Sequence, residues 1–317
     1  MQNIMIITKK EEQTVADARV RAINRVTIKG SIINVVLLIF KFVAGIVGGS
    51  AAMIADAVHS LSDFLTDVVV VFVRLGSKPE DRDHDFGHGK YETLATAAIG
   101  MALFIVGAML CYGGGAKIVS AMRGEALEQP GWIALAAALM SIALKEWAYR
   151  FTVSVGRRLD SPAVVANAWH HRSDALSSIG TAIGIGGAII LGSRWAVLDP
   201  IAAVVVSIFI MRTAYTLVAQ SMGELLEKSL PEDMERQIAD LASEEPTVSA
   251  IHHLRTRRIG SHIAIEMHVR MPGALSLYEA HQHATAIEQR LRERYGTETY
   301  INLHVEPVKV HGEYVKP

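Results

Sequence analysis

Two segments far apart in the chain share a pattern of side chains that could bind one metal ion. DAVHSLSD occupies residues 56–63 and NAWHHRSD occupies residues 167–174, so both contain A-x-H-x-x-S-D after an acidic or amide residue. Each places a histidine four residues before an aspartate, and side chains at that spacing share one face of a helix. Two imidazoles and two carboxylates form a ligand set that suits tetrahedral zinc. The pattern predicts a metal site made by His59, Asp63, His170 and Asp174.

Neighbouring polar residues leave some assignments in this site open. The alternative to a metal site is two polar patches that join helices by hydrogen bonds. His171 also lies in the second segment, but it is only three residues from Asp174, so His170 is the preferred ligand. Asp56 and Asp67 extend the polar stripe of the first segment and could orient a ligand or relay protons.

Both segments belong to long apolar stretches. Half of the 317 residues are hydrophobic, only 20% are charged, and the mean hydropathy is +0.28. Crossing a bilayer core takes about 20 residues. Six stretches have about that length, at 31–48, 52–74, 92–113, 131–152, 164–192 and 197–219. A large soluble helical bundle is the alternative, but most helices of such bundles show a polar face. The sequence predicts six transmembrane helices in a membrane domain at residues 31–221.

The loops predict the orientation of these helices. Basic residues are frequent before the first stretch and after the second and fourth, whereas the other loops carry only Lys117, Arg123 and Arg194. Cytosolic loops are enriched in lysine and arginine, so both termini are expected in the cytosol. Residues 1–30 are charged and are expected to be a cytosolic lead-in rather than a cleaved signal peptide. Absence of a targeting segment suits a bacterial inner membrane.

Charge and cysteine content exclude other classes of protein. The formal net charge is −1, which gives no general electrostatic attraction to nucleic acid. A single cysteine, Cys111, excludes an intrachain disulfide and a zinc site made of thiolates.

Residues 222–317 form a different kind of domain. They contain no membrane-length apolar stretch and hold eight of the thirteen histidines. Turn residues and hydrophobic periodicity predict helix, strand, strand, helix and strand at 231–243, 248–257, 262–271, 276–295 and 299–306. This order predicts a small cytosolic α+β domain of ferredoxin-like or metallochaperone-like type, with the helices on one face of a sheet.

The loop after the second stretch could bind a further ion. It reads DRDHDFGHGK at residues 81–90, with Asp81, His84 and His88 separated by three and four residues. A second metal site at the edge of the membrane and a solvated loop with a glycine turn are both open interpretations. Lys90, the last residue of this segment, could pair with Glu227 at the start of the cytosolic domain.

The paired motifs, the six stretches and the downstream pattern D-x-x-H-x-F-G-H-G-K-x-E-x-L resemble the cation diffusion facilitator family of metal/proton antiporters. The resemblance covers residues 15–310, approximately. It implies a homodimer that exports divalent cations from the cytosol in exchange for protons. It assigns the transport site to the four residues of the paired motifs, and it suggests a charge interlock between Lys90 and Glu227. Zinc is the first candidate substrate, and iron, cadmium, cobalt and manganese are further candidates.

The resemblance also implies a regulatory metal site in the cytosolic domain. The matching residues are His252, His268, His281, His304 and Glu306. Glu306 stands where some members have aspartate, which lengthens this ligand by one methylene and keeps the number of ligands. A set of solvated surface histidines is the alternative. His253, His262, His283 and His311 have no assignment.

Two other functions remain open on the sequence. A membrane metalloenzyme would need an open coordination position and a general base, for which Asp67 is the obvious candidate. A membrane-anchored metal sensor would use the histidine-rich domain, but its anchor would not need matched ligand pairs on two helices. Transport by alternating access involves no covalent chemistry, so the chain is expected not to be an enzyme.

Overall fold

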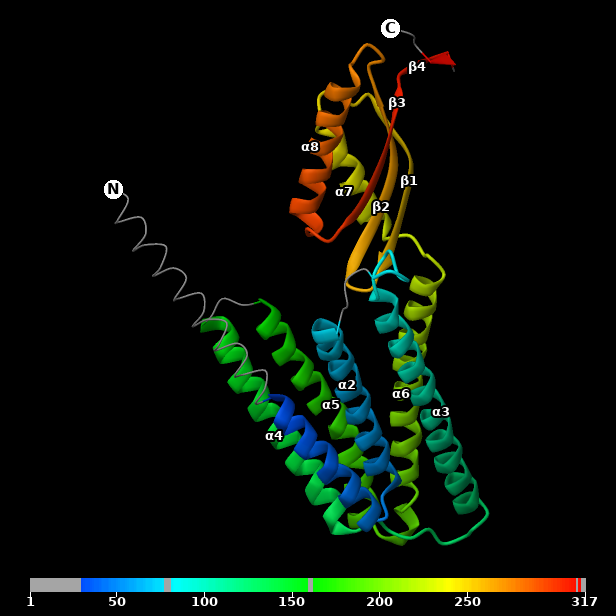
Figure 1. Cartoon of the computed structure of the whole chain (residues 1–317). Helices are drawn as coiled ribbons and strands as arrows, with labels where there is room; N and C mark the ends of the chain where they lie inside the picture. The colour runs from blue at the N-terminus through cyan, green and yellow to red at the C-terminus, as the bar shows by residue number, and fades with distance from the viewer. Residues whose placement is uncertain (1–29, 77–80, 159–161, 312, 315–317) are drawn as a thin grey trace, which may run out of the picture. The chain divides into compact units, whose positions relative to one another are not determined.

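The computed structural model describes residues 30–76, 81–158, 162–311 and 313–314, with the backbone alone described at 67, 69–76, 162–163 and 170–171. The chain divides into two compact units (Figure 1). The first unit contains Met1–Val68 and Ile99–Tyr215, and the second contains Val69–Ala98 and Thr216–Pro317. The domain boundaries expected from the sequence, at residues 30/31 and 221/222, remain a prediction.

Long helices account for the described chain from residue 30 to residue 225. They are Gly30–Val47, α2 (Ala51–Gly76), α3 (Gly89–Met122), α4 (Trp132–Arg158), α5 (Pro162–Ile190) and α6 (Leu198–Leu225), with the short 3-10 helix η1 (Ser193–Trp195) before α6. By length and composition, five of these helices could cross a membrane. The remaining helix, α2, has 26 residues and is also long enough, although it contains three aspartates. The predicted helical membrane domain is confirmed, and α3, α4 and α6 extend beyond the predicted stretches.

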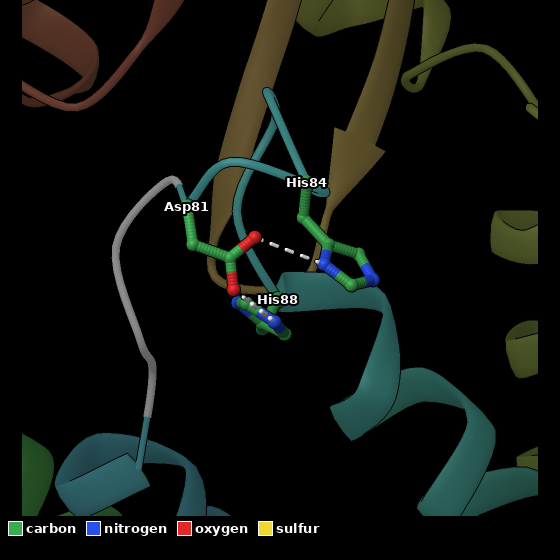
Figure 2. Close-up of side chains that lie close together, drawn as sticks. All are labelled: Asp81, His84 and His88. Atoms are coloured by element: carbon green, nitrogen blue, oxygen red, sulfur yellow. Dashed lines mark hydrogen bonds and ion pairs between the residues drawn. The ribbon is translucent and has the colours of Figure 1, made fainter.

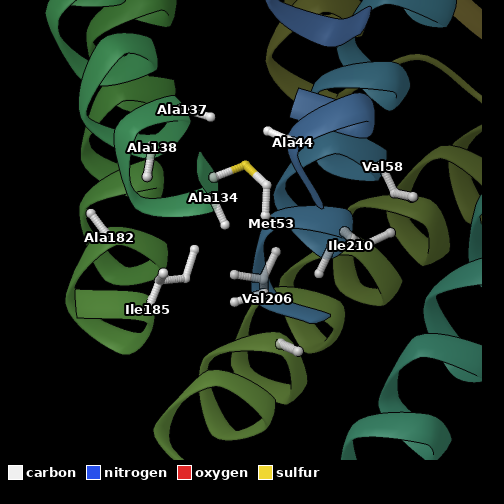
Figure 3. Close-up of a cluster of buried hydrophobic side chains, with 13 residues drawn as sticks. Ala44, Met53, Val58, Ala134, Ala137, Ala138, Ala182, Ile185, Val206 and Ile210 are labelled. Atoms are coloured by element: carbon white, nitrogen blue, oxygen red, sulfur yellow. The ribbon is translucent and has the colours of Figure 1, made fainter. Parts of the chain in front are cut away.

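The helices of the first unit pack through small side chains. The buried cluster in Figure 3 is rich in alanine, with Met53, Ile185 and Ile210 as its larger members. On α5, a Cβ added at Gly184 would lie only 2.4 Å from the Cβ of Ala202 on α6. Hydrophobic burial gives little driving force between helices in lipid, so close contact of small residues is what stabilises such a bundle.

The start of α2 is capped by a side chain of α6. The carboxylate of Asp199 accepts a hydrogen bond from the backbone N–H of Ala51 at 2.8 Å and from the Ser50 hydroxyl at 2.5 Å. The Ser50 hydroxyl oxygen in turn accepts the N–H of Met53 at 3.0 Å. The first N–H groups of a helix have no partner within it, so these bonds fix where α2 begins. Because α2 carries His59 and Asp63, Asp199 indirectly positions both.

The domain predicted to be cytosolic is a sheet covered on one face by two helices. Its elements are α7 (Glu232–Ser243), β1 (Ala250–Ile259), β2 (His262–Met271), α8 (Leu277–Tyr295) and β3 (Tyr300–Pro307). The strand order is β1-β2-β3, with β1 antiparallel and β3 parallel to the central β2 (Figure 1). The predicted order of elements is confirmed. A short hairpin of β4 (Lys309–Val310) and β5 (Glu313–Tyr314) was not predicted.

Alternation along β2 separates an apolar face from a polar one. Ile263, Ile265, Met267 and Val269 are buried against Ile287 of α8 and Ile238 of α7. Residues between them, including Glu266 and His268, point to the opposite face, since successive side chains of a strand alternate. The sheet therefore presents its histidines on the face that the helices leave open.

Within the second unit, the turn between β1 and β2 lies directly against the start of α3. A Cβ at Gly89 would lie 2.7 Å from the carbonyl oxygen of Ile259, and Gly260 has a positive φ of 58°. Both positions therefore need glycine, one for close approach and one for its backbone conformation. Glu224, near the end of α6, accepts hydrogen bonds from the Gly260 N–H and the Thr93 hydroxyl, each at 2.9 Å.

Candidate metal sites

The structure brings together three of the four residues of the paired motifs. His59 and Asp63 lie one turn apart on α2, and Asp174 comes from α5. One ligand atom from each of these side chains lies within 4.8 Å of the other two. Asp174 is buried, while His59 and Asp63 are half-buried. Divalent zinc takes nitrogen and oxygen ligands of these types, so the spacing fits one ion without rebuilding the helices.

The fourth residue, His170, lies one turn before Asp174 on α5. Its side chain, like that of His171, lies outside the part of the chain that the structure describes. The complete set of four ligands, and the preference for His170 over His171, therefore remain predictions.

A cavity of about 730 Å³ adjoins this cluster in the first unit. His59, Asp63 and Asp174 line one part of it. The other lining residues come from α5 and α6 and include Ser177, Ile183 and Phe209. The Nδ1 atom of His59 is buried and has no hydrogen-bond partner among the described residues. A buried polar atom costs free energy unless another group binds it, as a metal ion would do here.

Two buried lysines lie beside the candidate ligands. Lys145 of α4 places its Nζ 3.4 Å from an oxygen of Asp174. Lys41 of the first helix places its Nζ 2.6 Å from an oxygen of Asp56, and neither side chain is measurably exposed. Both lysines lie inside apolar stretches of the sequence, which does not identify their partners. Glu146 pairs with Arg150 at 2.8 Å, an ordinary i, i+4 contact.

The contacts of Asp56 do not fit the expected support of His59. Both of its oxygens accept a hydrogen bond from the Ser178 hydroxyl at 3.1 Å, and one also contacts Lys41. In the described residues Asp56 therefore neutralises a buried lysine and links α2 to α5. The side chain of Asp67, the other candidate relay, lies outside the described residues.

In the loop before α3, the structure brings together Asp81, His84 and His88 (Figure 2). One carboxylate oxygen of Asp81 lies 3.1 Å from Nδ1 of His84, and the other lies 3.3 Å from Nε2 of His88. The backbone N–H of Asp83 donates to the same carboxylate at 3.0 Å and is the main cause of its lowered pKa. Asp81 is exposed and both histidines are half-buried, so an ion bound here would stay accessible to solvent.

On the open face of the cytosolic sheet, side chains of all three strands converge. Glu306 of β3 lies 3.3 Å from Nε2 of His252 on β1 and 3.0 Å from Nδ1 of His268 on β2. His304 of β3 adds an imidazole, whose Nε2 is 3.7 Å from Glu306. The register of the strands brings these side chains together, because His268 pairs with both His252 and His304 across the sheet. Four of the five expected ligands thus share one surface.

His281 is the exception among the five. It is exposed on α8, and α8 packs through Ile287 and Leu291 on the opposite, apolar face of the sheet. Within one chain, the structure does not bring His281 to the other four residues.

The electrostatics of this cluster favour a bound cation. Burial is the main cause of the lowered pKa of His252, which keeps its imidazole neutral and able to coordinate. The pKa of Glu306 is also lowered, first by the hydrogen bond with His268, which keeps the carboxylate ionised. Arg270 competes for the same carboxylate at 3.6 Å.

His253 joins this cluster although strand alternation predicts that it points away. Pairing between β1 and β2 is irregular between His252 and Arg255, and His253 has a positive φ of 50°. A bulge of this kind turns an additional side chain toward the same face. The ring of His253 lies 5.1 Å from the rings of both His252 and His268. No signal in the sequence indicates this bulge.

His283, which has no assignment from the sequence, forms a structural contact. Its Nδ1 donates to the buried carboxylate of Glu245 at 2.7 Å, and Arg290 pairs with the same carboxylate. Glu245 lies between α7 and β1, so these contacts join that connection to α8. Burial alone would raise the pKa of Glu245, but the hydrogen bonds from His283 and Arg290 lower it more.

This contact predicts an acid-sensitive contribution to stability. A carboxylate with a lowered pKa stabilises the fold above its unfolded pKa of about 4.3, and the contribution is lost as pH falls through the folded pKa. We expect Glu245→Gln to reduce the free energy of unfolding at neutral pH by about 1–3 kcal/mol. The melting temperature of the purified protein, measured from pH 7 downward, checks this. Glu244→Gln, at the exposed neighbouring position, is the control. A deficit independent of pH would contradict the explanation.

The structure pairs Lys90, at the start of α3, with Glu227, just after α6. Arg257 of β1 also contacts Glu227, at 3.0 Å. The pairing therefore has a third member that the sequence does not reveal. Glu227 has a positive φ of 61°, which marks the sharp change of chain direction at this junction.

Comparison with known proteins identifies both parts of the chain. A family model described as the cation efflux transmembrane domain matches residues 28–226, and one described as the cytoplasmic domain of cation efflux proteins matches residues 230–308. Relatives include magnetosome protein MamB of Magnetospira sp. (strain QH-2), which is 29% identical over 88% of this chain and 93% of its own length. The manganese efflux system protein MneP of Bacillus subtilis is 30% identical over 92% of this chain and 98% of its own. Metal tolerance protein C1 of Arabidopsis thaliana is 31% identical over 86% of this chain and 59% of its own.

Proposed function

Because the chain belongs to the cation diffusion facilitator family of membrane cation efflux proteins, we propose that it exports divalent transition-metal ions from the cytosol in exchange for protons. The observation that carries this proposal is the cluster of His59, Asp63 and Asp174 beside a cavity in the helical unit. His170 would complete the coordination. An ion held between α2 and α5 would be released to the other side when these helices change their relative tilt.

Zinc is the proposed substrate. Two imidazoles and two carboxylates suit its tetrahedral preference, whereas harder cations such as manganese favour more oxygen ligands. The relative MneP is named for manganese efflux, so manganese is the second candidate. Iron, cobalt and cadmium accept the same ligands, because selectivity among these metals depends on geometry and availability as well as ligand type.

Proton exchange follows from the ligands proposed. A metal ion binds only neutral imidazole and ionised carboxylate, so metal and protons compete for one site. An ordinary imidazole titrates at about pH 6.5, which lies within the range of pH values found on the two sides of cell membranes. Release toward a more acidic side would therefore be accompanied by proton uptake, and the protons would leave on the cytosolic side.

The cluster on the cytosolic sheet is proposed to serve regulation. His252, His268, His304 and Glu306 would bind cytosolic metal and draw two copies of the chain together, with the transporter acting as a homodimer. The group of Asp81, His84 and His88 would hold an ion before or after transport. Lys90 with Glu227 would connect the helices to the cytosolic domain. We place the protein in a bacterial inner membrane with both termini in the cytosol.

Metal flux into proteoliposomes tests the proposal. The purified chain should move Zn²⁺ into vesicles whose lumen is more acidic than the outside, and the lumen should become more alkaline as metal enters. Metal binding without flux would favour the alternative function, a membrane-anchored metal sensor. Zinc-dependent hydrolysis without flux would favour a membrane metalloenzyme.

Replacing one imidazole should change the metal preference. We expect His59→Asp to shift the ratio of Zn²⁺ to Mn²⁺ flux toward manganese by about tenfold, equivalent to about 1.4 kcal/mol, because it adds an oxygen ligand and a negative charge. Competition assays with both metals in the same vesicles measure this ratio. The same exchange at His262, which lies outside the three clusters, is the control. An unchanged ratio would mean that His59 does not contact the ion.

A further inference from the structure

The residue of most interest beyond the proposed ligands is Lys145. It lies on α4, which packs along α5, and its side chain is only 4% exposed. Its Nζ is 3.4 Å from Asp174, and Asp174 belongs to the cluster with His59 and Asp63. The ammonium group of Lys145 therefore already contacts the carboxylate of Asp174, which a bound metal ion would also contact.

The summed formal charge of three groups at this site changes sign when a divalent ion binds. Asp63, Asp174 and Lys145 together carry a formal charge of −1 without metal and +1 with it. Without Lys145, the same groups would carry −2 and 0. Uncompensated charge is costly in a low-dielectric interior, so the lysine makes the empty site more stable and the occupied site less stable.

We propose that Lys145 is a tethered counter-cation, which neutralises Asp174 when the transport site is empty and promotes metal release when it is full. This inference rests on the proposed transport function and deepens it. Lys145 is a positioning residue, since it acts on the ion through Asp174 and through charge repulsion. A transporter must release its substrate as well as bind it, and a site that is neutral when occupied would hold the ion too tightly.

Lys41 provides a matched comparison in the same unit. It is also a buried lysine paired with an aspartate, but its partner Asp56 is not in the metal-binding cluster. Removing either lysine leaves a buried carboxylate without its cation, which destabilises the fold. A bound metal ion replaces the lost charge directly at Asp174, whereas the charge of Lys41 acts on Asp174 more weakly than on its own partner Asp56.

The test compares Lys145→Met with Lys41→Met, both in full-length protein that also carries His252→Ala and His268→Ala to remove cytosolic metal binding. In proteoliposomes, Lys145→Met should lower the half-saturating Zn²⁺ concentration by about tenfold or more and should also lower the maximal flux. Lys145→Arg should move both values back toward those of the parent protein. In thermal melting, Zn²⁺ should restore the stability of Lys145→Met to a much greater extent than that of Lys41→Met. An unchanged or raised half-saturating concentration in Lys145→Met would overturn the proposal.

A second comparison applies if Lys145→Met cannot be recovered in a folded state. Asp174→Asn leaves Lys145 facing the ion without its carboxylate, whereas Lys145→Met/Asp174→Asn removes both charges. The double variant should bind Zn²⁺ more tightly than Asp174→Asn, and equal affinity would overturn the proposal.

Asp63→Asn distinguishes failure of the proposed transport site from failure of the proposed role of Lys145. If it leaves flux intact, the transport site itself is wrong. If it abolishes flux while removal of Lys145 leaves affinity unchanged, only the counter-cation is wrong.

Discussion

Zinc flux is expected to fall by about a hundredfold or more when Asp63 is replaced by asparagine. The exchange keeps the size of the side chain but removes one of the carboxylates that the cluster offers to the ion. Changes merely adjacent to metal ligands already cost about 10–100-fold in affinity, so loss of a charged ligand should cost at least as much. Flux of Zn²⁺ into proteoliposomes under a proton gradient is the measurement, and Asp174→Asn should give a similar loss.

The control for this result is Asp240→Asn, which removes an exposed carboxylate of α7. Size-exclusion chromatography and circular dichroism should show that all three variants keep the helical content and oligomeric state of the parent protein. Flux near the parent level in Asp63→Asn would exclude the transport site assigned to α2 and α5.

Removal of two imidazoles from the cytosolic cluster should have the second large effect. We expect His252→Ala/His268→Ala to weaken Zn²⁺ binding at this cluster by about a hundredfold or more, because both residues contact Glu306 in the group that would hold the ion. Isothermal titration calorimetry on full-length protein should show loss of one class of binding site. Maximal flux should persist, while the metal concentration needed for half-maximal flux should rise.

His262→Ala/His311→Ala is the matched control, since it removes two histidines of the same domain that lie outside the cluster. It should leave the calorimetric titration unchanged. Equal loss of binding in the two double variants would indicate that these histidines are solvated surface residues and do not form a defined metal site. Loss of maximal flux in His252→Ala/His268→Ala would mean that this cluster belongs to the transport path rather than to regulation.

Hydropathy and strand alternation were sufficient to predict most of the fold. Apolar stretches of membrane length form helices with few alternatives, because backbone polar groups inside a bilayer must be hydrogen-bonded within the segment. In the cytosolic domain, alternation along 262–271 identified the apolar face of β2. The length of α3 was underestimated, since its last turns, up to Met122, extend beyond the apolar stretch used to predict it.

Pairing between helices was much less predictable than their existence. A spacing of four residues identifies His59 and Asp63 as neighbours within α2, but it gives no register against α4 or α5. Lys145 could therefore not be matched with Asp174 from the sequence, nor Lys41 with Asp56. His253 shows the same limit in a strand, because a bulge changes the direction of a side chain without a distinctive residue type.

The cap that Asp199 places on the start of α2 gives that helix one fixed end. At a rise of 1.5 Å per residue, His59 lies about 12 Å along the axis from the capped end. If α2 tilts by about 10° around that end, His59 moves by about 2 Å. Bond lengths to a metal ion tolerate about 0.2 Å. A small rotation of α2 about its capped end would thus be enough to break the coordination of the ion, while the hydrogen bonds of the cap stay formed.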